Sequence, residues 1–399
     1  MKTNIRAAAA LLILPLFLLL IQGCKKDSDP STPGLTTGDL MLKGRVVDAT
    51  TGSGIVARVF IAGMSVTTNS EGVYEISSKL IGNGSWELLV EANEYGLATA
   101  IATITDDAAM VRTIRLAPLS NGATLGQSGG TLTVTDPESL TAGASAVLTV
   151  APGTFTGTQA VLFNRLTGAG IPGYAPAGML NLCAFSIAAT AVVPAKPMTV
   201  TLPLPVADPS IATLSLLKFD PTTITWSVVN GTQAVVDPST HTATVQVDAF
   251  GYFSLAISGS YSESAGNGST PVTIDLDKTR SQISFSFTAT GQYTSVPAGV
   301  SAAWLKNIAS QNTKLNGERV AFDQTTEVML NYIGYKPDSL TTTQSAGYYR
   351  WMPRVTYTDY QMPVTASVNG MVITGTIGKR AYAPSSSYQF VHDQGGGGK

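Results

Sequence analysis

Charge is scarce in this sequence. Only 13% of the 399 residues are Asp, Glu, Lys or Arg, whereas an ordinary soluble domain carries about 25%. The formal net charge of −2 leaves no excess of basic residues that could follow a phosphate backbone. We therefore expect no nucleic-acid partner.

Cysteine and histidine are rarer still. The cysteines are Cys24 and Cys183, and the histidines are His241 and His392. These residues do not form a recognisable zinc ligand set, and neither histidine accompanies a G-x-S-x-G nucleophile sequence. Phosphate loops, dinucleotide fingerprints and calcium loops are also missing. We expect no metal, no cofactor and no catalytic residue.

The apolar run at the start of the chain is too short for a permanent membrane span. It covers about 15 residues, from Ala7 to Ile21, and a helix needs roughly 20 to cross a bilayer. Lys2 and Arg6 precede it. A basic start followed by a short apolar run is typical of a secretory signal.

The residues after this run, "IQGC" at 21–24, resemble the lipobox of bacterial lipoproteins. The resemblance implies a signal peptide at 1–23, cleavage after Gly23, and acylation of Cys24 with palmitate-like chains. Each buried methylene contributes about 0.8 kcal/mol, so two or three chains anchor a protein durably. An acylated Cys24 leaves Cys183 without an intrachain disulfide partner. In its apolar setting we expect Cys183 to be a small core residue.

Residues 24–39 are polar and rich in Ser, Thr, Pro and Gly, which predicts a flexible tether. The charged "KKDSD" directly after Cys24 resembles the surface-export signals of Bacteroidetes lipoproteins. This resemblance implies an outer-membrane lipid anchor with the protein exposed at the cell surface. An anchor that faces the periplasm is the alternative.

Alternation of apolar and polar residues dominates the rest of the chain. It is clear at 86–91, 244–248 and 283–288, and it predicts β-strands. The best helical candidate is short, at about 302–310. We therefore predict an all-β fold of β-sandwich domains in series.

The first domain is predicted at 40–118. Its "LKGRVVDATTGSGIVARVFI" and "VTTNSEGVYEI" resemble the carboxypeptidase regulatory-like domain, a transthyretin-like β-sandwich. The family's usual Asp is replaced by Asn69, which an Asx-type turn can accommodate. The resemblance implies an accessory or structural module without catalytic residues. The matching positions are turn residues and inward-facing strand residues: Gly44, Val46, Asp48, Thr51, Gly52, Ala57, Val59, Ile61, Thr68, Gly72, Tyr74 and Ile76.

The second domain is predicted at 121–258. The order of its segments resembles the ZU-five-type domain of zonula occludens proteins, netrin receptors and ankyrins. Some of these domains cleave themselves at a His-Phe-Ser sequence, where this chain has Tyr252-Phe253-Ser254. With a pKa near 10, tyrosine is a poor base. We therefore expect an ordinary strand here, with Phe253 on the core side. The positions that carry the resemblance are Gly129, Gly130, Pro152, Gly153, Val200, Leu202, Pro203, Phe219, Asp220 and Trp226.

A linker is predicted at 259–270, a third β-rich domain of no recognised family at 271–390, and a disordered tail at 391–399. Nine of the fourteen tyrosines lie in the third domain. Its "YYRWMPRVTYTDY", residues 348–360, could stack on sugars or anchor a protein partner. The alternative is that its aromatic residues fill a sandwich core. The candidate ligand-binding residues are Tyr348, Tyr349, Arg350, Trp351, Arg354, Tyr357 and Tyr360.

Together these features predict a non-catalytic envelope lipoprotein that displays β-domains for adhesion, or for binding a glycan or another envelope protein. The membrane partner is reached through Cys24. One alternative is a hydrolase acting on glycan or peptide, or an accessory subunit, with its site in 271–390. A purely structural envelope component is the other.

Overall fold

The computed structural model describes residues 40–106, 108–119, 121–189, 193–264, 271–275, 282–315, 318–319, 325–332 and 348–393, with only the backbone in parts of the last strands. The predicted signal peptide, Cys24, the tether and most of the tail lie outside these residues. Nearly all regular structure in them is β-strand, which confirms the all-β fold class. No helix within the described residues is long and apolar enough to cross a membrane.

Two sheets pack around one apolar core in the N-terminal part. A three-stranded sheet has the order β4-β1-β8, and β2, β3, β5, β6 and β7 belong to the second sheet. The turns form as the sequence predicts: Asn69 Oδ1 accepts hydrogen bonds from the amides of Glu71 and Val73 at 3.0 and 2.9 Å. The elements are β1 (Met41–Asp48), β2 (Arg58–Ile61), β3 (Met64–Thr67), β4 (Val73–Ser77), α1 (Ser78–Ile81), β5 (Gly84–Glu91), β6 (Ala98–Ile104), β7 (Ala108–Arg112) and β8 (Ile114–Leu116).

Strands from the predicted third domain complete the second of these sheets. β20 (Gln282–Thr288) pairs with β24 (Thr325–Tyr332), and β24 pairs with β7, so the order is β20-β24-β7-β6-β5-β2-β3. Asn331 of β24 also donates a hydrogen bond to the Lys43 carbonyl at 3.1 Å. The prediction of separate domains in series does not include a pairing between β24 and β7.

The middle of the chain forms the largest sheet, with the order β10-β11-β14-β17-β16-β15-β18-β13-β12-β9. Its core includes Phe163, Phe185, Phe253 and the predicted core residue Cys183, which is fully buried. The strands are β9 (Gly122–Leu125), β10 (Gly130–Thr135), β11 (Ser145–Val150), β12 (Gln159–Leu166), β13 (Met179–Ala189), β14 (Met198–Pro203), β15 (Thr213–Asp220), β16 (Thr225–Asp237), β17 (Thr242–Val247) and β18 (Gly251–Glu263).

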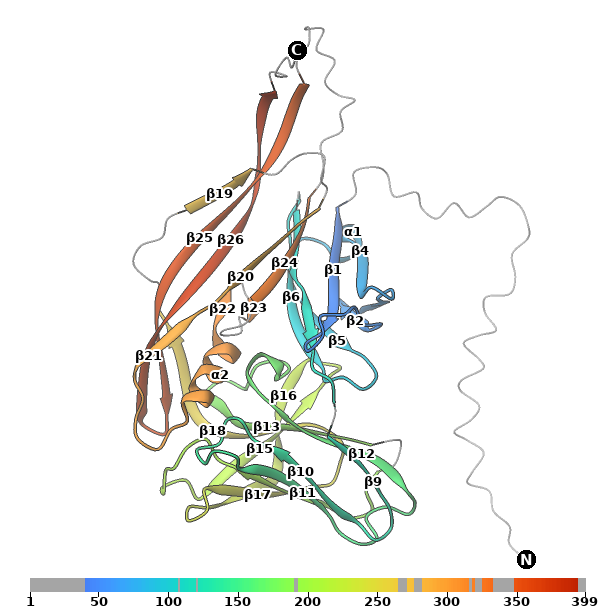
Figure 1. Ribbon diagram of the computed structural model, residues 1–399, viewed down its shortest axis with the longest axis vertical. Coiled ribbons are helices and arrows are strands. Elements are labelled where there is room, and N and C mark those ends of the chain that lie inside the picture. The colour runs from blue at the N-terminus through green and yellow to red at the C-terminus, as the bar shows by residue number, and fades with distance from the viewer. Residues whose placement is uncertain are drawn as a thin grey trace, which may run out of the picture. The chain divides into compact units, whose positions relative to one another are not determined.

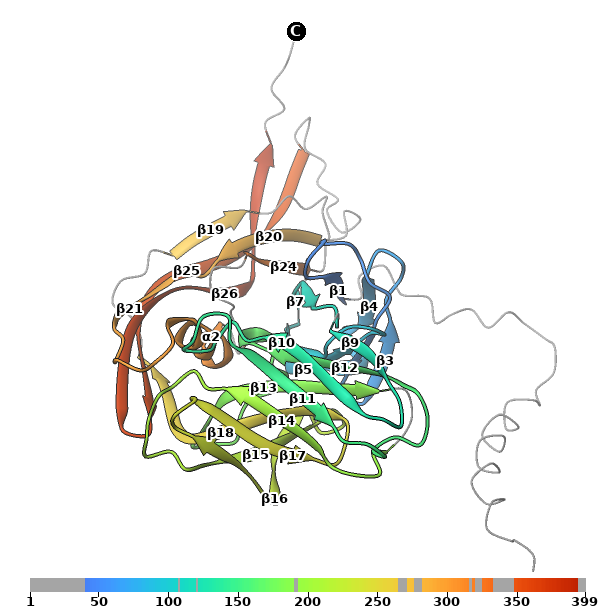
Figure 2. The same cartoon turned by 60° about the horizontal axis from the view of Figure 1, so that its bottom comes forward.

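The predicted helix is confirmed as α2 (Ala302–Asn312), and it packs on this middle core. The Ser301 hydroxyl accepts a hydrogen bond from the Trp304 amide at 3.4 Å, as an N-cap residue should. The Trp304 ring is fully buried, and its indole N–H donates to the Asn181 carbonyl at 3.2 Å. In Figure 2, α2 lies between the middle sheet and the long C-terminal strands.

The C-terminal strands form a long antiparallel ribbon (Figure 1). Strands β25 (Tyr348–Val368) and β26 (Met371–Asp393) are joined at Asn369 and Gly370, whose φ values are 44° and 83°. β25 also pairs with β18 and with β19 (Pro271–Asp275), and β26 pairs with β21 (Gly291–Ser295). The remaining short elements are η1 (Gly168–Gly170), β22 (Lys314–Leu315) and β23 (Glu318–Arg319).

Candidate functional sites

The predicted aromatic cluster lies on β25, opposite β26. Tyr348 pairs with Asp393, Trp351 with Phe390, and Tyr360 with Lys379. The side chains of Tyr348, Tyr349, Arg350, Trp351, Arg354 and Tyr357 lie outside the described part of the chain. Their role in ligand binding therefore stays a prediction. Tyr360, which is half-buried, is the member whose side chain is described.

Tyr360 lines a hollow of about 520 Å³. The hollow lies where β26 continues beyond the end of β21, which pairs with β26 only at 374–377. Residues from β20, β24, β25 and β26 form its wall. The lining residues are Ser286, Phe287, Thr288, Thr290, Thr325, Asp359, Tyr360, Gln361, Gly378, Lys379 and Arg380.

An ion pair across the two strands is part of the wall of this hollow. Asp359 and Arg380 lie directly opposite each other. Arg380 Nε donates to Asp359 Oδ1 at 2.7 Å and Nη2 donates to Oδ2 at 2.9 Å. Gln361 lies over Gly378, where an added Cβ would come within 3.3 Å of the Gln361 amide nitrogen. A two-bond guanidinium–carboxylate pair has a defined geometry.

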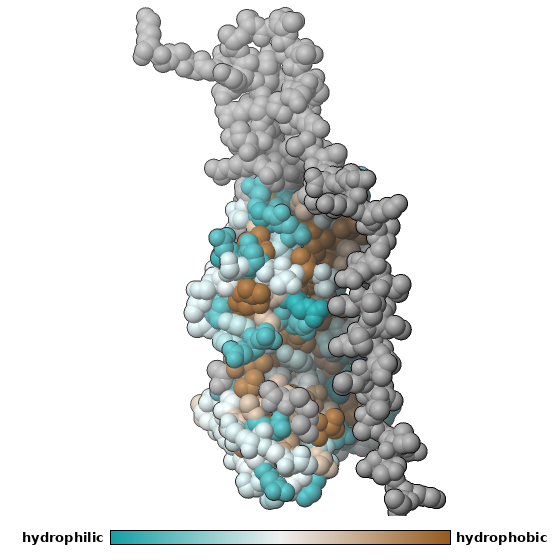
Figure 3. Space-filling model, turned by 90° about the vertical axis from the view of Figure 1, so that its right-hand side faces the viewer, coloured by the Kyte–Doolittle hydropathy of each residue, from teal (hydrophilic) through white to brown (hydrophobic). Residues whose placement is uncertain are grey.

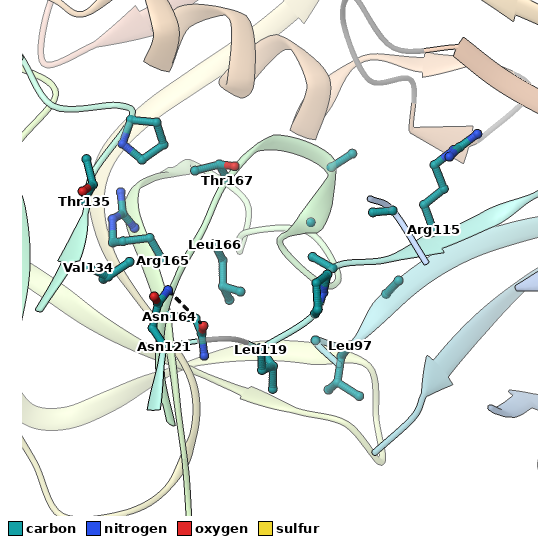
Figure 4. A pocket seen from close by; sticks show the side chains of 18 of the residues that line it. Leu97, Arg115, Leu119, Asn121, Val134, Thr135, Asn164, Arg165, Leu166 and Thr167 are labelled. Carbon is teal, nitrogen blue, oxygen red and sulfur yellow. Dashed lines mark hydrogen bonds between the residues drawn. The ribbon is translucent and has the colours of Figure 1, made fainter. Parts of the chain in front are cut away.

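A larger cavity, of about 680 Å³, lies where three distant parts of the chain meet. Arg112 and Arg115 come from β7 and β8, Asn164–Leu166 from the end of β12, and Thr325 from β24. β9 pairs with β12 as far as Leu162, and beyond it the Phe163 amide donates a hydrogen bond to the Asn121 carbonyl at 2.8 Å. The described lining residues include no acidic and no aromatic side chain. Figure 4 shows Leu97, Leu119 and Leu166 between Arg115 and the pair Asn121 and Asn164.

Asn164 is the unusual member of this cavity. It is only 6% exposed, and its Oδ1 accepts a hydrogen bond from Asn121 at 3.5 Å. Its Nδ2 has no partner within the described residues, and neither has the hydroxyl of Ser186 directly opposite on β13. Buried donors are almost always satisfied, because an unsatisfied one costs stability.

In the wall of the cavity, Arg165 is neutralised by two buried carboxylates. Its Nε lies 2.7 Å from Asp136 Oδ2, and its Nη2 lies 3.3 Å from Glu138 Oε2. It also donates to the Ala184 carbonyl. Burial raises the pKa of Glu138 to about 7, although the positive charge of Arg165 opposes the rise. Asp136 and Glu138 therefore belong to a buried ion-pair network. Asp220 and Asp237, by contrast, accept hydrogen bonds from the turn amides of Thr222 and Ser239.

Tyr252, Phe253 and Ser254 lie on β18 with the predicted alternation. Phe253 is in the middle core, and the Tyr252 hydroxyl on the other face accepts a hydrogen bond from the Leu97 amide at 2.9 Å. The Ser254 hydroxyl donates to the Asn181 side-chain oxygen at 2.9 Å. An amide oxygen is not a base that could activate the serine.

Two other kinds of site, a metal site and an apolar docking surface, find no support within the described residues. No three His, Cys, Asp or Glu side chains there come together as a metal would require. The exposed large apolar residues are Val56, Leu80, Val193, Val228, Val235, Val296 and Val372, of which Val228 and Val235 share β16. On the face in Figure 3, hydrophobic and hydrophilic areas are interspersed. Single exposed apolar residues are normal for a protein surface.

Sequence reasoning missed both cavities. Their walls combine residues that are far apart in the sequence, and only strand pairing brings them together. One signal was visible: Asn164 and Arg165 interrupt the apolar strand "AVLFNRL". A polar pair inside such a strand indicates a buried polar contact.

No protein-family model and no curated protein matches this chain. Among solved structures, the chain is similar to a Bacteroides fragilis NCTC 9343 protein of unknown function that is considered membrane-associated. The two share 10% sequence identity, and the match covers 89% of this chain and 98% of the other at a TM-score of 0.27. A similarity at this level supports no functional argument.

Proposed function

We propose that this protein is a non-catalytic lipoprotein of the outer membrane that binds a glycan at the cell surface. The anchor would be Cys24, acylated after cleavage behind Gly23. The lipobox-like "IQGC" and the charged "KKDSD" that follows it support this part of the proposal. Two or three acyl chains would hold the β-domains at the membrane durably.

The hollow at Tyr360 is the observation that carries the binding proposal. Its polar groups include a guanidinium–carboxylate pair and the amide of Gln361, and Tyr360 lies between Asp359 and Gln361 on β25. Tyrosine offers an apolar ring with a polar end, and these polar groups can exchange hydrogen bonds with neighbouring hydroxyls. Many hydroxyls on a ring with apolar faces are the defining chemistry of sugars. The hollow is of a size common for small-ligand sites, about 300–1,000 Å³.

A glycan array probed with the purified full-length protein tests this proposal. Asp359→Asn and Arg380→Gln should each weaken binding to the glycans retained by the parent protein by at least about tenfold, because each leaves its partner unpaired. Tyr360→Ala should weaken the same glycans. The matched control is Arg58→Gln, which breaks a pair that also lies directly across two strands, at 3.3 Å from Glu91.

The control variant should bind like the parent protein. An array without any retained glycan would contradict the proposal, and so would unchanged binding by all three hollow variants. If the protein instead captured a purified envelope protein through the same residues, the partner would be a protein, since Tyr and Arg also dominate protein interfaces.

A further inference from the structure

Asparagine followed by glycine is a chemically labile pair. Asparagine is a thermolabile residue, and a following glycine has no side chain to obstruct attack by its own amide nitrogen on the asparagine side chain. Two of the Asn-Gly pairs in this chain, at 267 and 316, lie outside the described residues, so the structure distinguishes the other four. The pairs begin at Asn83, Asn121, Asn230, Asn267, Asn316 and Asn369.

Asn230 lies in a bulge of β16. β15 pairs with β16 at 225–228 and again at 233–235, and the residues between, 229–232, stand opposite Leu216 alone. β17 pairs with β16 only at 235–237. A bulge of this kind interrupts the ladder of backbone hydrogen bonds. The backbone around Asn230 is therefore less constrained than the paired parts of the strand.

Both members of this pair are open to solvent. Asn230 and Gly231 are exposed, and a Cβ added to Gly231 would meet no atom within 4 Å. The φ of Gly231 is 77°, which glycine adopts without strain. Within the described residues no hydrogen bond holds the Asn230 side chain. This side chain can therefore turn its amide carbon toward the Gly231 nitrogen.

Asn369, between β25 and β26, is the matched contrast. Its Nδ2 donates to Asp208 Oδ2 at 2.7 Å and to Ser210 Oγ at 2.8 Å. A hydrogen bond to an ionised carboxylate is among the stronger kinds. The Asn369 side chain must turn away from both partners before it can meet the amide nitrogen of Gly370. The same chemistry is therefore opposed at this position.

The remaining two described pairs are also restrained. Asn83 Nδ2 donates to Asp106 Oδ1, and Asn121 Nδ2 donates to Asn164 Oδ1 at 3.5 Å. The glycine that follows each of them begins a paired strand, β5 or β9. Strand pairing fixes the backbone that the reaction has to bend.

We propose that Asn230 is a site of spontaneous covalent modification. The Gly231 amide nitrogen loses its proton to solvent hydroxide and forms a bond to Asn230 Cγ. The bond from Cγ to Nδ2 breaks, and ammonia leaves after taking a proton from water, which gives a five-membered succinimide ring. Water then opens the ring at either carbonyl, so the product at this position is aspartate or isoaspartate.

The product changes the charge of an uncharged segment. Residues 226–236 contain no Asp, Glu, Lys or Arg, and the reaction adds one carboxylate to their exposed bulge. Isoaspartate also lengthens the main chain by one methylene, which an unpaired bulge can accommodate better than a paired strand. This site is separate from the hollow at Tyr360, and its test does not depend on glycan binding there.

Peptide mapping by mass spectrometry of the purified full-length protein tests the proposal. Folded protein and urea-denatured protein are held at the same mildly alkaline pH, and both are digested under acidic conditions that stop the reaction. In the folded protein, conversion at Asn230 should be at least about tenfold faster than at Asn369, whose hydrogen bonds must first break. In urea the two should convert at similar rates, because no fold restrains either of them. Conversion at Asn230 should give two isomeric peptides of equal mass.

Two variants test the cause. Asn230→Gln should abolish the conversion at this position, because the longer side chain closes a six-membered ring much more slowly, and should leave Asn369 unaffected. Asp208→Ala should accelerate conversion at Asn369 at least about threefold, since it removes the carboxylate that holds the side chain. The matched control is Asp220→Ala, whose carboxylate accepts from the turn amide of Thr222 instead. It should leave both rates unchanged.

Three outcomes would overturn the assignment. The first is that the folded protein converts Asn369 or Asn83 as fast as Asn230. The second is that Asn230 remains an amide in the folded protein, whether or not it converts in urea. The third is that Asp208→Ala leaves the rate at Asn369 unchanged, because hydrogen bonding would then not be the reason for the difference.

Discussion

Asn307 of α2 donates a hydrogen bond from its Nδ2 to Oε1 of Glu138, 169 residues earlier in the chain, at 2.6 Å. Glu138 also contacts Arg165 of β12, and the side chains of Glu138 and Arg165 are both 2% exposed. A buried carboxylate is therefore part of the contact that holds α2 against the middle sheet. Its protonation should affect how stably the two are joined.

Stability should fall between about pH 4.5 and pH 7 through Glu138. Burial raises the pKa of Glu138 from its ordinary value of 4.5 to about 7 in the folded protein. The folded state then binds more protons than the unfolded state in this window, so its free energy of unfolding decreases as pH rises. The decrease is about 3 kcal/mol, and stability levels off above the folded pKa.

Chemical denaturation across this pH range, on the parent protein and Glu138→Gln, measures the effect. The variant cannot titrate at this position. Its free energy of unfolding should therefore depend much less on pH between 4.5 and 7 than that of the parent protein. Glu75→Gln is the control, because Glu75 is half-exposed beside Lys43. Equal slopes in the parent protein and Glu138→Gln would contradict the expectation.

Asn164→Leu should stabilise the protein in the absence of ligand. The change removes a buried donor that has no partner in the described residues, and leucine has a similar size. The free energy of unfolding should rise by about 1–2 kcal/mol.

Asn181→Leu is the matched control for this change. Asn181 is also buried, but it accepts a hydrogen bond from Ser254 at 2.9 Å and donates to Gln311 at 3.3 Å. Its replacement should destabilise the protein by about 1–3 kcal/mol, because it leaves buried partners unsatisfied. A destabilised Asn164→Leu would indicate that the Asn164 amide is satisfied in the folded protein.

Trp304→Ala should be strongly destabilising. Trp304 is fully buried in the middle core, and its indole N–H donates to the Asn181 carbonyl. Truncation of a buried tryptophan costs about 3–5 kcal/mol. Denaturant unfolding measures the loss, and Leu80→Ala is the control because Leu80 is 69% exposed. A loss below about 1 kcal/mol would show that α2 contributes little to this core.

The strands could be predicted from sequence where one face meets a core and the other meets water. Val245 and Val247 are buried and Thr244 and Gln246 are exposed, as their alternation indicates. The same rule fails at Leu89, because alternation at 86–91 puts Leu89 on the same face as Glu87 and Glu91. It is only 3% exposed, because it packs in a second cluster with Leu217 and Trp226 of the middle sheet. Alternation describes one strand and contains no information on what covers its other face.

Pairing between distant strands could not be predicted either. β24 joins β7 through Leu330 and Met110, although more than 200 residues separate them. Short strands of similar composition can pair in many combinations, and only packing of the whole core selects one. Both cavities depend on this selection, so their residues could not be assembled from spacing in the sequence.

Cys24→Ser should detach the protein from the membrane. If Cys24 carries the acyl chains, the variant should not incorporate an alkyne-labelled palmitate in growing cells, and the protein should lose its durable attachment to the membrane fraction. Cys183→Ser is the control, because burial makes the Cys183 thiol inert and raises its pKa. That variant should keep the label.

Protease treatment of intact cells then distinguishes the two orientations of the anchor, since a surface-exposed chain is digested and a periplasmic one is protected. Label retained by Cys24→Ser would refute lipidation at this residue.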